Sequence, residues 1–260
     1  MNASGTFRNK LFSGKPVFGI VLKTPETAIA ELAGLTGFDF AWIDMEHSSL
    51  SFREAESLVI ALENQECAAL IRVAENSPNL IGQALDAGAN LIVVPHIDTP
   101  EDAEKVVRSA KYYPRGRRGF SSGNRITRQG LDKLDVALMA KENARNIVIA
   151  QIESKIAVEN VSRIAAVDGI DVLFLGLGDL SQDLGVPGEY RHPFLRNQVE
   201  QFSKAVRPTG KILATIAPDP NDLEEYVRLG FRLFTCGTDI GLLGNALRAQ
   251  LDNIRLKLQL

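Results

Sequence analysis

Short apolar segments alternate with amphipathic segments along almost the whole chain. Eight of the short segments are rich in β-branched and aromatic residues, and most are apolar at both odd and even positions. Parallel strands covered by helices on both faces have this pattern. The eight predicted strands are residues 17–21, 38–43, 69–73, 91–94, 147–152, 172–175, 212–216 and 233–235.

The segments between the strands carry helix start and stop signals. Pro25, Pro78 and Pro100 lie near predicted helix starts, and Ser51 is followed three residues later by Glu54, as in a capping box. A glycine follows several helical stretches, where a left-handed residue is expected. These glycines are Gly88, Gly169, Gly210 and Gly230.

The strand and helix alternation continues without a linker, a low-complexity tract or a close internal repeat. Eight such units in 260 residues predict one domain, residues 1–260, folded as a closed (β/α)8 barrel rather than an open doubly wound sheet. The interval 95–146 is irregular, with a loop rich in Gly, Arg and Ser at 112–130 and a predicted helix at 131–144. A loop of this length predicts a lid or a substrate wall.

Charge and composition exclude several classes of protein. The chain has 29 Lys and Arg against 32 Asp and Glu, so it lacks the basic surface of a nucleic-acid-binding protein. Neither a polybasic membrane patch nor an apolar run long enough to span a bilayer is present. Two distant cysteines, Cys67 and Cys236, and a polar amino terminus without a signal-peptide pattern predict a reduced, cytoplasmic protein.

Reactive groups of such a barrel lie at the carboxyl ends of its strands. In this chain those ends are unusually polar, and their residues are Asp44, Glu46, His47, Arg72, Gln151, Glu153, Asp179 and Ser181. The topology therefore directs an imidazole, a guanidinium and several carboxylates to one rim.

Glu153 and Asp179 are candidate ligands for a divalent metal such as Mg²⁺, Mn²⁺ or Co²⁺, because hard cations are held by carboxylates, waters and substrate oxygens. The alternative is that the two residues only begin and cap the helices that follow. Gln151 has the parity of Glu153 and can hydrogen-bond the ligand shell.

His47 and Arg72 each allow two interpretations. A lone histidine is commonly a packed or surface residue, but His47 lies beyond a strand end near two carboxylates, where it can act as an acid or base. Arg72 ends an apolar strand and needs an anion, which is either a structural carboxylate or a substrate carboxylate.

Other mechanisms have less support. Lys23 and Lys155 are the lysines near predicted carboxyl ends and the sixth strand has none, which disfavours a Schiff-base aldolase. The signatures of serine hydrolases, P-loop proteins and dinucleotide-binding folds are missing from the sequence.

The strand-end residues resemble those of the HpcH/HpaI family of class II pyruvate aldolases, which belongs to the phosphoenolpyruvate/pyruvate superfamily. The resemblance runs from Phe18 to the carboxy-terminal helix. It is carried by Ile43-Asp44-Met45-Glu46-His47, Leu70-Ile71-Arg72-Val73, Leu85-Asp86-Ala87-Gly88-Ala89, Val93-Val94-Pro95, Pro114-Arg115-Gly116-Arg117-Arg118-Gly119, Gln151-Ile152-Glu153, Gly176-Leu177-Gly178-Asp179-Leu180-Ser181 and Gly237-Thr238-Asp239.

The resemblance implies a metal-dependent aldolase that cleaves 4-hydroxy-2-oxoacids into pyruvate, or a close 2-oxoacid, and an aldehyde. It assigns the metal to Glu153 and Asp179, with Gln151 nearby. It gives Arg72 the enolate oxygen or carboxylate of pyruvate and makes His47, oriented by Asp86, the acid/base. It places the substrate carboxylate at the N–H groups of Gly178 and Asp179.

Three positions depart from the family pattern, which often has glycine at Met45 and proline at Leu177 and Tyr113. These differences, together with a divergent loop at 120–130 that we expect to face the aldehyde, leave the aldehyde partner open.

The carboxy-terminal segment has a helical stripe of apolar residues at Leu243, Ala246, Leu247, Leu251, Ile254 and Leu258. The stripe packs either on its own barrel or, as the resemblance implies, on another subunit of a homohexamer, a dimer of trimers. Two other functions stay open at this point. One is an oxaloacetate decarboxylase or another lyase of the superfamily, and the other is a non-catalytic metabolite-binding barrel.

Overall fold

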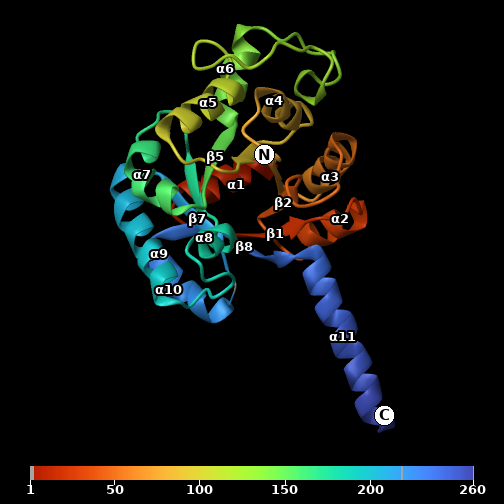
Figure 1. The fold of residues 1–260 in the computed structure, drawn as a ribbon. Helices are drawn as coiled ribbons and strands as arrows, with labels where there is room; N and C mark the ends of the chain where they lie inside the picture. Colours follow the sequence, from red (N-terminus) through yellow and green to blue (C-terminus); the bar gives the residue numbers. More distant parts are fainter. Residues whose placement is uncertain (1–2, 218, 260) are drawn as a thin grey trace.

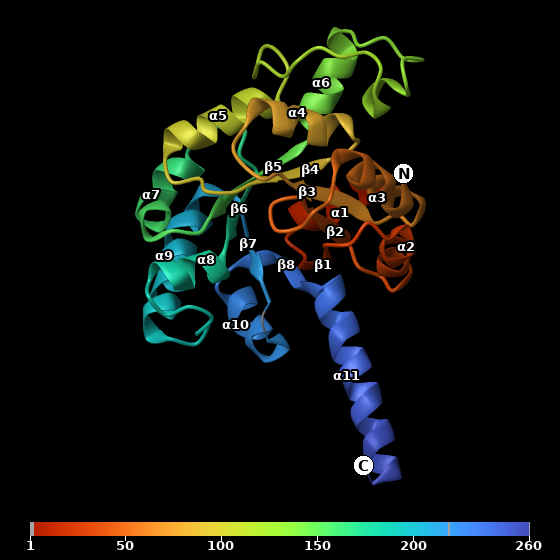
Figure 2. The ribbon, with the colours of Figure 1, turned by 45° about the vertical axis from the view of Figure 1, so that its right-hand side comes forward.

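The eight strands form a closed parallel barrel in chain order (Figures 1 and 2). The structure is a computed structural model that describes residues 3–217 and 219–259. The strands are β1 (Val17–Leu22), β2 (Phe40–Asp44), β3 (Ala68–Arg72), β4 (Leu91–Val94), β5 (Ile147–Ile152), β6 (Val172–Leu175), β7 (Ile212–Ile216) and β8 (Phe231–Thr238). Strand β8 pairs with β1 and closes the ring, which confirms the predicted (β/α)8 barrel.

Helices cover the outside of the barrel. They are α1 (Ala3–Phe12), α2 (Thr27–Leu35), α3 (Phe52–Asn64), α4 (Pro78–Asp86), α5 (Pro100–Ala110), α6 (Val136–Arg145), α7 (Lys155–Ala165), α8 (Leu177–Asp183), α9 (Pro193–Val206), α10 (Leu223–Arg228) and α11 (Asp239–Leu258), with short 3₁₀ turns η1 (Arg125–Thr127), η2 (Arg207–Thr209) and η3 (Pro220–Asp222). Ser51 and Glu54 form the predicted capping box of α3, and Pro78 and Pro100 lie in the first turns of α4 and α5.

The apolar side chains form two layers, one inside the barrel and one between the strands and the helices. The interior layer includes Phe40, Trp42 and Phe174. Helix α1 closes the amino-terminal end of this layer, where Phe7 meets Phe40 edge to face with ring centroids 5.7 Å apart. Such a contact contributes about 0.5–1.5 kcal/mol beyond the buried area. The polar chemistry is thereby confined to the carboxyl end.

Two element boundaries differ from the predicted ones. Strand β8 extends beyond 233–235 on both sides because pairing with β1 and β7 continues through register shifts, past the half-buried Arg232 that interrupts the apolar run. Helix α6 begins at Val136 rather than at 131, because the Asp135 side chain accepts the Leu138 N–H and caps the helix there. The loop before α6 contains the turn η1, which the apolar pattern does not predict.

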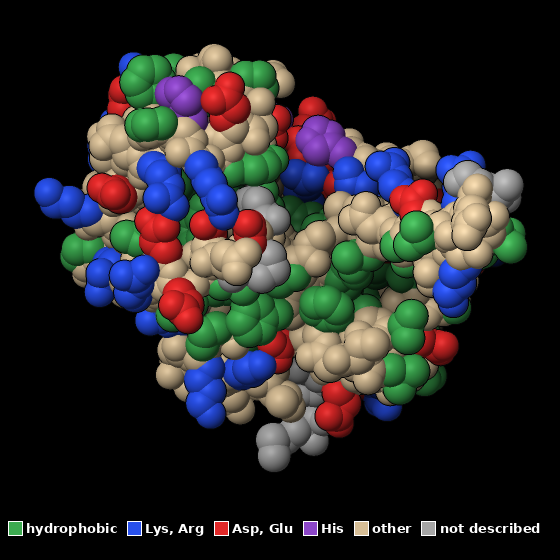
Figure 3. All heavy atoms as spheres, turned by 90° about the horizontal axis from the view of Figure 1, so that it is seen from below, with side chains coloured by type: hydrophobic (Ala, Val, Ile, Leu, Met, Phe, Trp, Pro, Cys, Tyr) green, Lys and Arg blue, Asp and Glu red, His purple; other side chains and the backbone are tan. Residues whose placement is uncertain are grey.

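Helix α11 projects away from the barrel, on the side opposite the α6 segment (Figures 1 and 2). Its apolar residues are mostly open to solvent, with Leu247 63% exposed and Leu251 47% exposed. Figure 3 shows hydrophobic side chains lying between charged ones on the face from which α11 projects. Packing of the apolar stripe on its own barrel is therefore wrong for this structure. No helix among residues 3–217 and 219–259 is long and apolar enough to cross a bilayer.

Candidate active site

A pocket of about 190 Å³ opens at the carboxyl end of the barrel. Its lining comes from the ends of most strands, which parallel register brings to one level. Trp42 and Phe174 of the interior layer form part of its wall, with ring centroids 4.8 Å apart. Polar groups stand above them, among them Lys23, Arg72 and Asp179. The pocket thus combines an apolar base with a charged rim, as small-molecule sites commonly do.

Arg72 is held by two carboxylates from β2 and the loop after it. Its Nε and Nη2 donate to the two carboxylate oxygens of Asp44 at 3.0 and 2.8 Å, and Nη1 lies 2.8 Å from Glu46 Oε2. Only the two contacts with Asp44 are hydrogen bonds, and the contact with Glu46 is an ion pair in which Oε2 accepts no hydrogen bond, so Arg72 keeps N–H groups for a ligand in the pocket. Arg72 therefore has the structural carboxylate partner that was one of its two interpretations. This partner, Asp44, leaves Arg72 able to bind a substrate carboxylate as well.

Asp44 is fully buried and surrounded by donors. Burial acts to raise the pKa of this carboxyl, but the hydrogen bonds and positive charge of Arg72 outweigh it. The His47 backbone N–H and the Lys23 charge act in the same direction as Arg72, so the pKa of Asp44 lies below its ordinary value. Asp44 therefore keeps its negative charge and orients Arg72.

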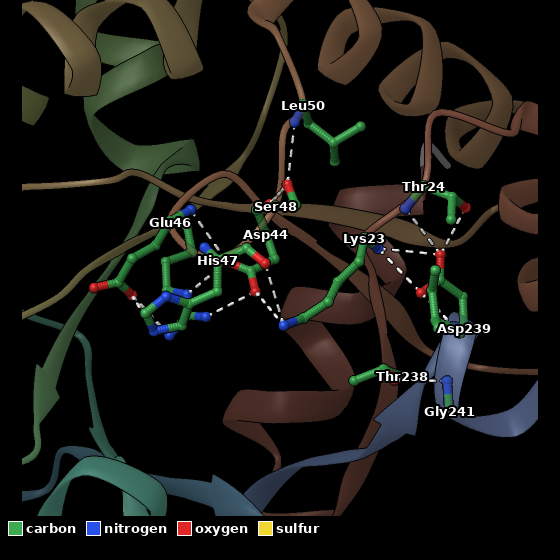
Figure 4. Close-up of polar contacts among 12 residues, drawn as sticks. Lys23, Thr24, Asp44, Glu46, His47, Ser48, Leu50, Thr238, Asp239 and Gly241 are labelled. Carbon is green, nitrogen blue, oxygen red and sulfur yellow. Dashed lines mark hydrogen bonds and ion pairs between the residues drawn. The ribbon is translucent and has the colours of Figure 1, made fainter. Parts of the chain in front are cut away.

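His47 stands at the mouth of the site on a short loop (Figure 4). Its side chain is 54% exposed, and Nε2 lies 3.8 Å from Glu46 Oε2. The loop is anchored below, because the N–H groups of Glu46 and His47 donate to Asp44 Oδ1 and the Ser48 hydroxyl donates to the Asp44 carbonyl. The imidazole is thus accessible to a substrate and to water, as an acid/base requires.

Glu153 lies on the other side of the rim and is only 3% exposed. Its carboxylate accepts the amide of Gln151 and, at 2.8 Å, the backbone N–H of His96, whose Nδ1 lies 3.0 Å away. Burial raises the pKa of Glu153 to about 6, against the lowering effect of these hydrogen bonds and with a further increase from the charge of Asp179. Glu153 and Asp179 thus repel each other electrostatically, and His96, at the exposed edge of the site, offsets only part of the burial and repulsion that raise the pKa of Glu153.

This pair fits a hard divalent cation. Mg²⁺ in enzymes is commonly held by one or two carboxylates, with waters and substrate oxygens as the other ligands. A cation between Glu153 and Asp179 would offset the burial and the mutual repulsion that raise the pKa of Glu153. No cluster of three or more His, Cys, Asp or Glu residues suited to a metal occurs in the described part of the chain, so this site needs oxygens from outside the protein.

Two glycines shape the metal side of the rim. A Cβ atom on Gly176 would lie 2.9 Å from the Cβ of Glu153, so a larger residue there would displace the carboxylate. A Cβ atom on Gly178 would meet nothing within 4 Å. Gly178 and Asp179 lie in the first turn of α8, where backbone N–H groups have no partner within the helix and can receive an anion.

Asp86 lies apart from these residues. It ends α4, and the end of a barrel helix lies at the amino-terminal side of the strands, away from His47. Its carboxylate accepts a hydrogen bond at 2.6 Å from Arg118, whose guanidinium stacks over Tyr112. Asp86 and His47 of one chain therefore do not meet. Asp86 lies at the amino-terminal end of the barrel, where α4 ends, and His47 lies at the carboxyl end, after β2.

The loop 112–130 is also separate from the pocket. Arg125 pairs with Glu63 at the end of α3 and lies against Gly88. The pocket walls, as far as the described residues form them, receive no side chain from this loop. The predicted contact of residues 120–130 with the aldehyde is thus not made within one chain.

His96 is a site residue to which the sequence assigned no role, and it contacts Glu46, which the strand-end pattern had placed on the rim. His96 follows β4 with a positive φ of 55°, and its Nε2 lies 3.3 Å from Glu46 Oε1. It therefore bridges Glu46 on the arginine side and Glu153 on the metal side. The sequence signal for His96 was its position just beyond Pro95, at a strand end. Its positive φ, which is backbone strain of a kind common at functional sites, cannot be read from the sequence.

Known proteins resemble this chain over nearly its whole length. Residues 18–246 match the family profile described as HpcH/HpaI aldolase/citrate lyase. The 2-keto-3-deoxy-L-rhamnonate aldolase of Klebsiella pneumoniae is 34% identical over 254 residues, which cover 96% of this chain and 94% of that enzyme. The hydroxypyruvate/pyruvate aldolase of Roseobacter denitrificans is 33% identical over 241 residues, with 92% and 93% coverage.

A solved structure agrees with these relatives. The crystal structure of an HpcH/HpaI aldolase/citrate lyase family protein from Burkholderia cenocepacia J2315 matches with a TM-score of 0.89 and 32% identity, covering 96% of this chain and 99% of that one.

Proposed function

Because the chain belongs to the HpcH/HpaI aldolase/citrate lyase family, we propose that it is a divalent-metal-dependent pyruvate aldolase. The reaction is the reversible cleavage of a 4-hydroxy-2-oxoacid into pyruvate, or a close 2-oxoacid, and an aldehyde. The observation that carries this proposal is the arrangement of one rim, where Arg72 and Asp179 line the pocket and the buried Glu153 lies next to Asp179 and Gln151. Such an arrangement suits a reaction in which negative charge develops on a substrate oxygen.

Glu153 and Asp179 are the residues that would hold Mg²⁺, Mn²⁺ or Co²⁺, with Gln151 fixing Glu153. When bound, the metal supplies a Lewis acid that polarises the keto oxygen of the substrate and stabilises the enolate. The N–H groups of Gly178 and Asp179 receive the carboxylate next to the keto group, which orients the substrate in the pocket.

The remaining steps belong to the arginine side. His47 accepts the proton of the C4 hydroxyl as the C3–C4 bond breaks, and the bonding electron pair moves into the enolate of pyruvate. N–H groups of Arg72 that make no hydrogen bond to Asp44 donate to the enolate oxygen. The protonated His47 then returns the proton to C3 through a water, which its exposure allows.

We further propose that residues 1–260 form one domain, that the protein acts in the cytoplasm, and that it assembles as a homohexamer, a dimer of trimers. The apolar stripe of α11 supports assembly, because exposed apolar surface of this kind marks contacts between proteins. In an assembly with shared sites, Asp86 can act on His47 of a neighbouring subunit.

A coupled assay of pyruvate release tests the function. The substrates are a panel of 4-hydroxy-2-oxoacids together with oxaloacetate, each with EDTA and with added Mg²⁺, Mn²⁺ or Co²⁺. We expect release from hydroxy-oxoacids that stops with EDTA and returns with metal. Turnover that resists EDTA contradicts the proposal. Turnover of oxaloacetate alone assigns the protein to the decarboxylases, and turnover of nothing in the panel favours a metabolite-binding barrel.

A further inference from the structure

Lys23 at the end of β1 has no role in the steps above, although it lines the site pocket. We propose that its ammonium group binds a carboxylate at the distal end of the substrate, so that the enzyme selects aldehydes that carry an anionic group. This inference rests on the proposed aldolase function and names the class of its aldehyde.

Lys23 lies on a different part of the ring from the residues assigned to the 2-oxoacid carboxylate. Those residues are Gly178 and Asp179 after β6, whereas Lys23 follows β1, three strands further around the ring. A substrate whose oxoacid carboxylate lies at Gly178 therefore extends across the pocket toward β1. Figure 4 shows the Lys23 side chain reaching from β1 toward the rim residues Asp44 and His47.

The rim cations differ in how fully the protein engages them. Arg72 donates two hydrogen bonds to Asp44 at 3.0 and 2.8 Å, and its Nη1 lies 2.8 Å from the Glu46 carboxylate. The Nζ of Lys23 lies 3.5 Å from Asp44 Oδ2, beyond a good hydrogen bond, and 3.3 Å from the carbonyl of His47. An ammonium group has three donors, so Lys23 retains capacity for a stronger acceptor.

Asp44 does not need Lys23 as a partner. Its carboxylate already accepts two hydrogen bonds from Arg72 and the N–H groups of Glu46 and His47. The Lys23 side chain is also 32% exposed, so its charge reaches the pocket and solvent. The contacts of Lys23 within the protein therefore contribute little to stability, and its ammonium group is free to bind a ligand.

A neighbouring hollow offers the competing interpretation. It shares Val21 and Ile216 with the site pocket and continues over Leu223 and Leu242, so its walls are mostly apolar. An aldehyde that extended there would be selected for an apolar tail. We favour the anionic class because Lys23 borders the site pocket itself, whereas Leu223 and Leu242 line only the hollow.

The test uses two acceptor aldehydes of matched shape with the metal-loaded enzyme and pyruvate. Succinic semialdehyde carries a carboxylate, and 4-methylpentanal carries an isopropyl group in its place. We expect kcat/KM to favour succinic semialdehyde, and Lys23→Met to reduce that preference by about 10- to 100-fold, as for loss of a hydrogen bond between charged groups. Lys23→Arg should retain most of the preference, and Lys105→Met, on the exposed face of α5, is the matched control.

A partial reaction separates this inference from the proposed function. Exchange of the pyruvate C3 hydrogens with solvent deuterium, without any aldehyde, reports enolate formation alone. If the wild-type protein shows no exchange in the presence of metal, the aldolase function fails. If exchange occurs but the wild type prefers 4-methylpentanal, the apolar hollow is the aldehyde site and Lys23 is not. An equal fall for both aldehydes in Lys23→Met also overturns the proposal, because Lys23 then acts by positioning the Asp44–His47 loop.

Discussion

The two sides of the rim bury a carboxylate each, and the fold treats them in opposite ways. Asp44 and Glu153 are both almost completely buried. The arginine side surrounds Asp44 with Arg72 and backbone donors, and the pKa of Asp44 falls. The metal side leaves Glu153 beside another carboxylate, and burial raises the pKa of Glu153 to about 6. The charge of Asp44 is thus balanced within the chain, whereas His96 balances that of Glu153 only in part, which leaves a place for a cation.

This difference separates a structural charge from a functional one. The buried ion pair with Asp44, held by two hydrogen bonds, fixes the direction of Arg72 before substrate arrives. A buried carboxylate whose pKa is raised, such as Glu153, weakens the fold when it is ionised, and proteins keep such groups where chemistry requires them. Substitutions on one side of the rim that leave the other side intact therefore test whether Asp44 is structural and Glu153 functional.

The largest expected effect is on catalysis, through Glu153→Gln. Loss of this charge removes half of the proposed metal site, and several kcal/mol of electrostatic stabilisation of the enolate disappear with it. We expect kcat/KM to fall by about 10³-fold or more, equivalent to about 4 kcal/mol. Steady-state kinetics of pyruvate release with saturating metal measures the change.

Glu159→Gln is the matched control, because Glu159 is an exposed residue of α7 on the element that follows Glu153. It should leave kcat/KM unchanged. Near-normal activity in Glu153→Gln contradicts the assignment of the metal side.

The next largest effect is on stability, through Asp44→Asn. This change leaves the buried Arg72 with Glu46 as its charged partner and breaks a pair in which Asp44 is fully buried and the Arg72 side chain is 11% exposed. Removing one member of such a pair costs about 3 kcal/mol. Urea denaturation followed by circular dichroism measures the change in the free energy of unfolding.

Asp132→Asn gives the exposed counterpart, since Asp132 pairs with Arg128 at the surface. Surface pairs contribute little, so this variant should unfold almost like the wild type. If both substitutions lower the free energy of unfolding by equally small amounts, the buried pair of Asp44 with Arg72 does not stabilise the fold as proposed.

A third effect concerns metal binding in the absence of turnover. A divalent ion at 100 times its dissociation constant stabilises the folded state by about 2.7 kcal/mol, and calorimetry detects this as a higher Tm. We expect the shift in the wild type and in Asp44→Asn but not in Glu153→Gln. A shift of the same size in Glu153→Gln places the metal elsewhere.

The sequence predicted the barrel well because most of its strands are apolar on both faces and its helices carry strong start signals, such as Ser51 with Glu54. It did not predict α1, whose ten residues are mostly polar and which contributes Phe7 and Leu11 to the core. Strand ends were misjudged where a polar residue, Arg232, interrupts the apolar run.

The same limits apply to the rim. Strand order brought Arg72, Glu153 and Asp179 into consideration, because carboxyl ends of parallel strands converge. The bridge through His96 depends on a positive φ and on two partners distant in the sequence, so no local pattern reveals it. The proposed partnership of Asp86 with His47 came from a motif, and a motif does not say whether two residues meet in one chain or between two.

The smallest effect is a pH dependence that distinguishes the two carboxylates directly. Glu153 has a folded pKa of about 6 against 4.5 for an ordinary glutamate, so its contribution is fully present below pH 4.5 and is lost as the pH rises through 6. The loss is about 2 kcal/mol. Asp44 has the opposite sign, and its contribution disappears only as the pH falls below 3.8. As the pH rises from 4.5 to 6, therefore, ionisation of Glu153 lowers the free energy of unfolding, while the contribution of Asp44 stays constant.

Urea denaturation in EDTA at pH 4.5 and 7 should show this loss in the wild type and in Glu159→Gln, and Glu153→Gln should remove it. A pH dependence unchanged by Glu153→Gln means that burial of this carboxylate is not what sets the two sides of the rim apart.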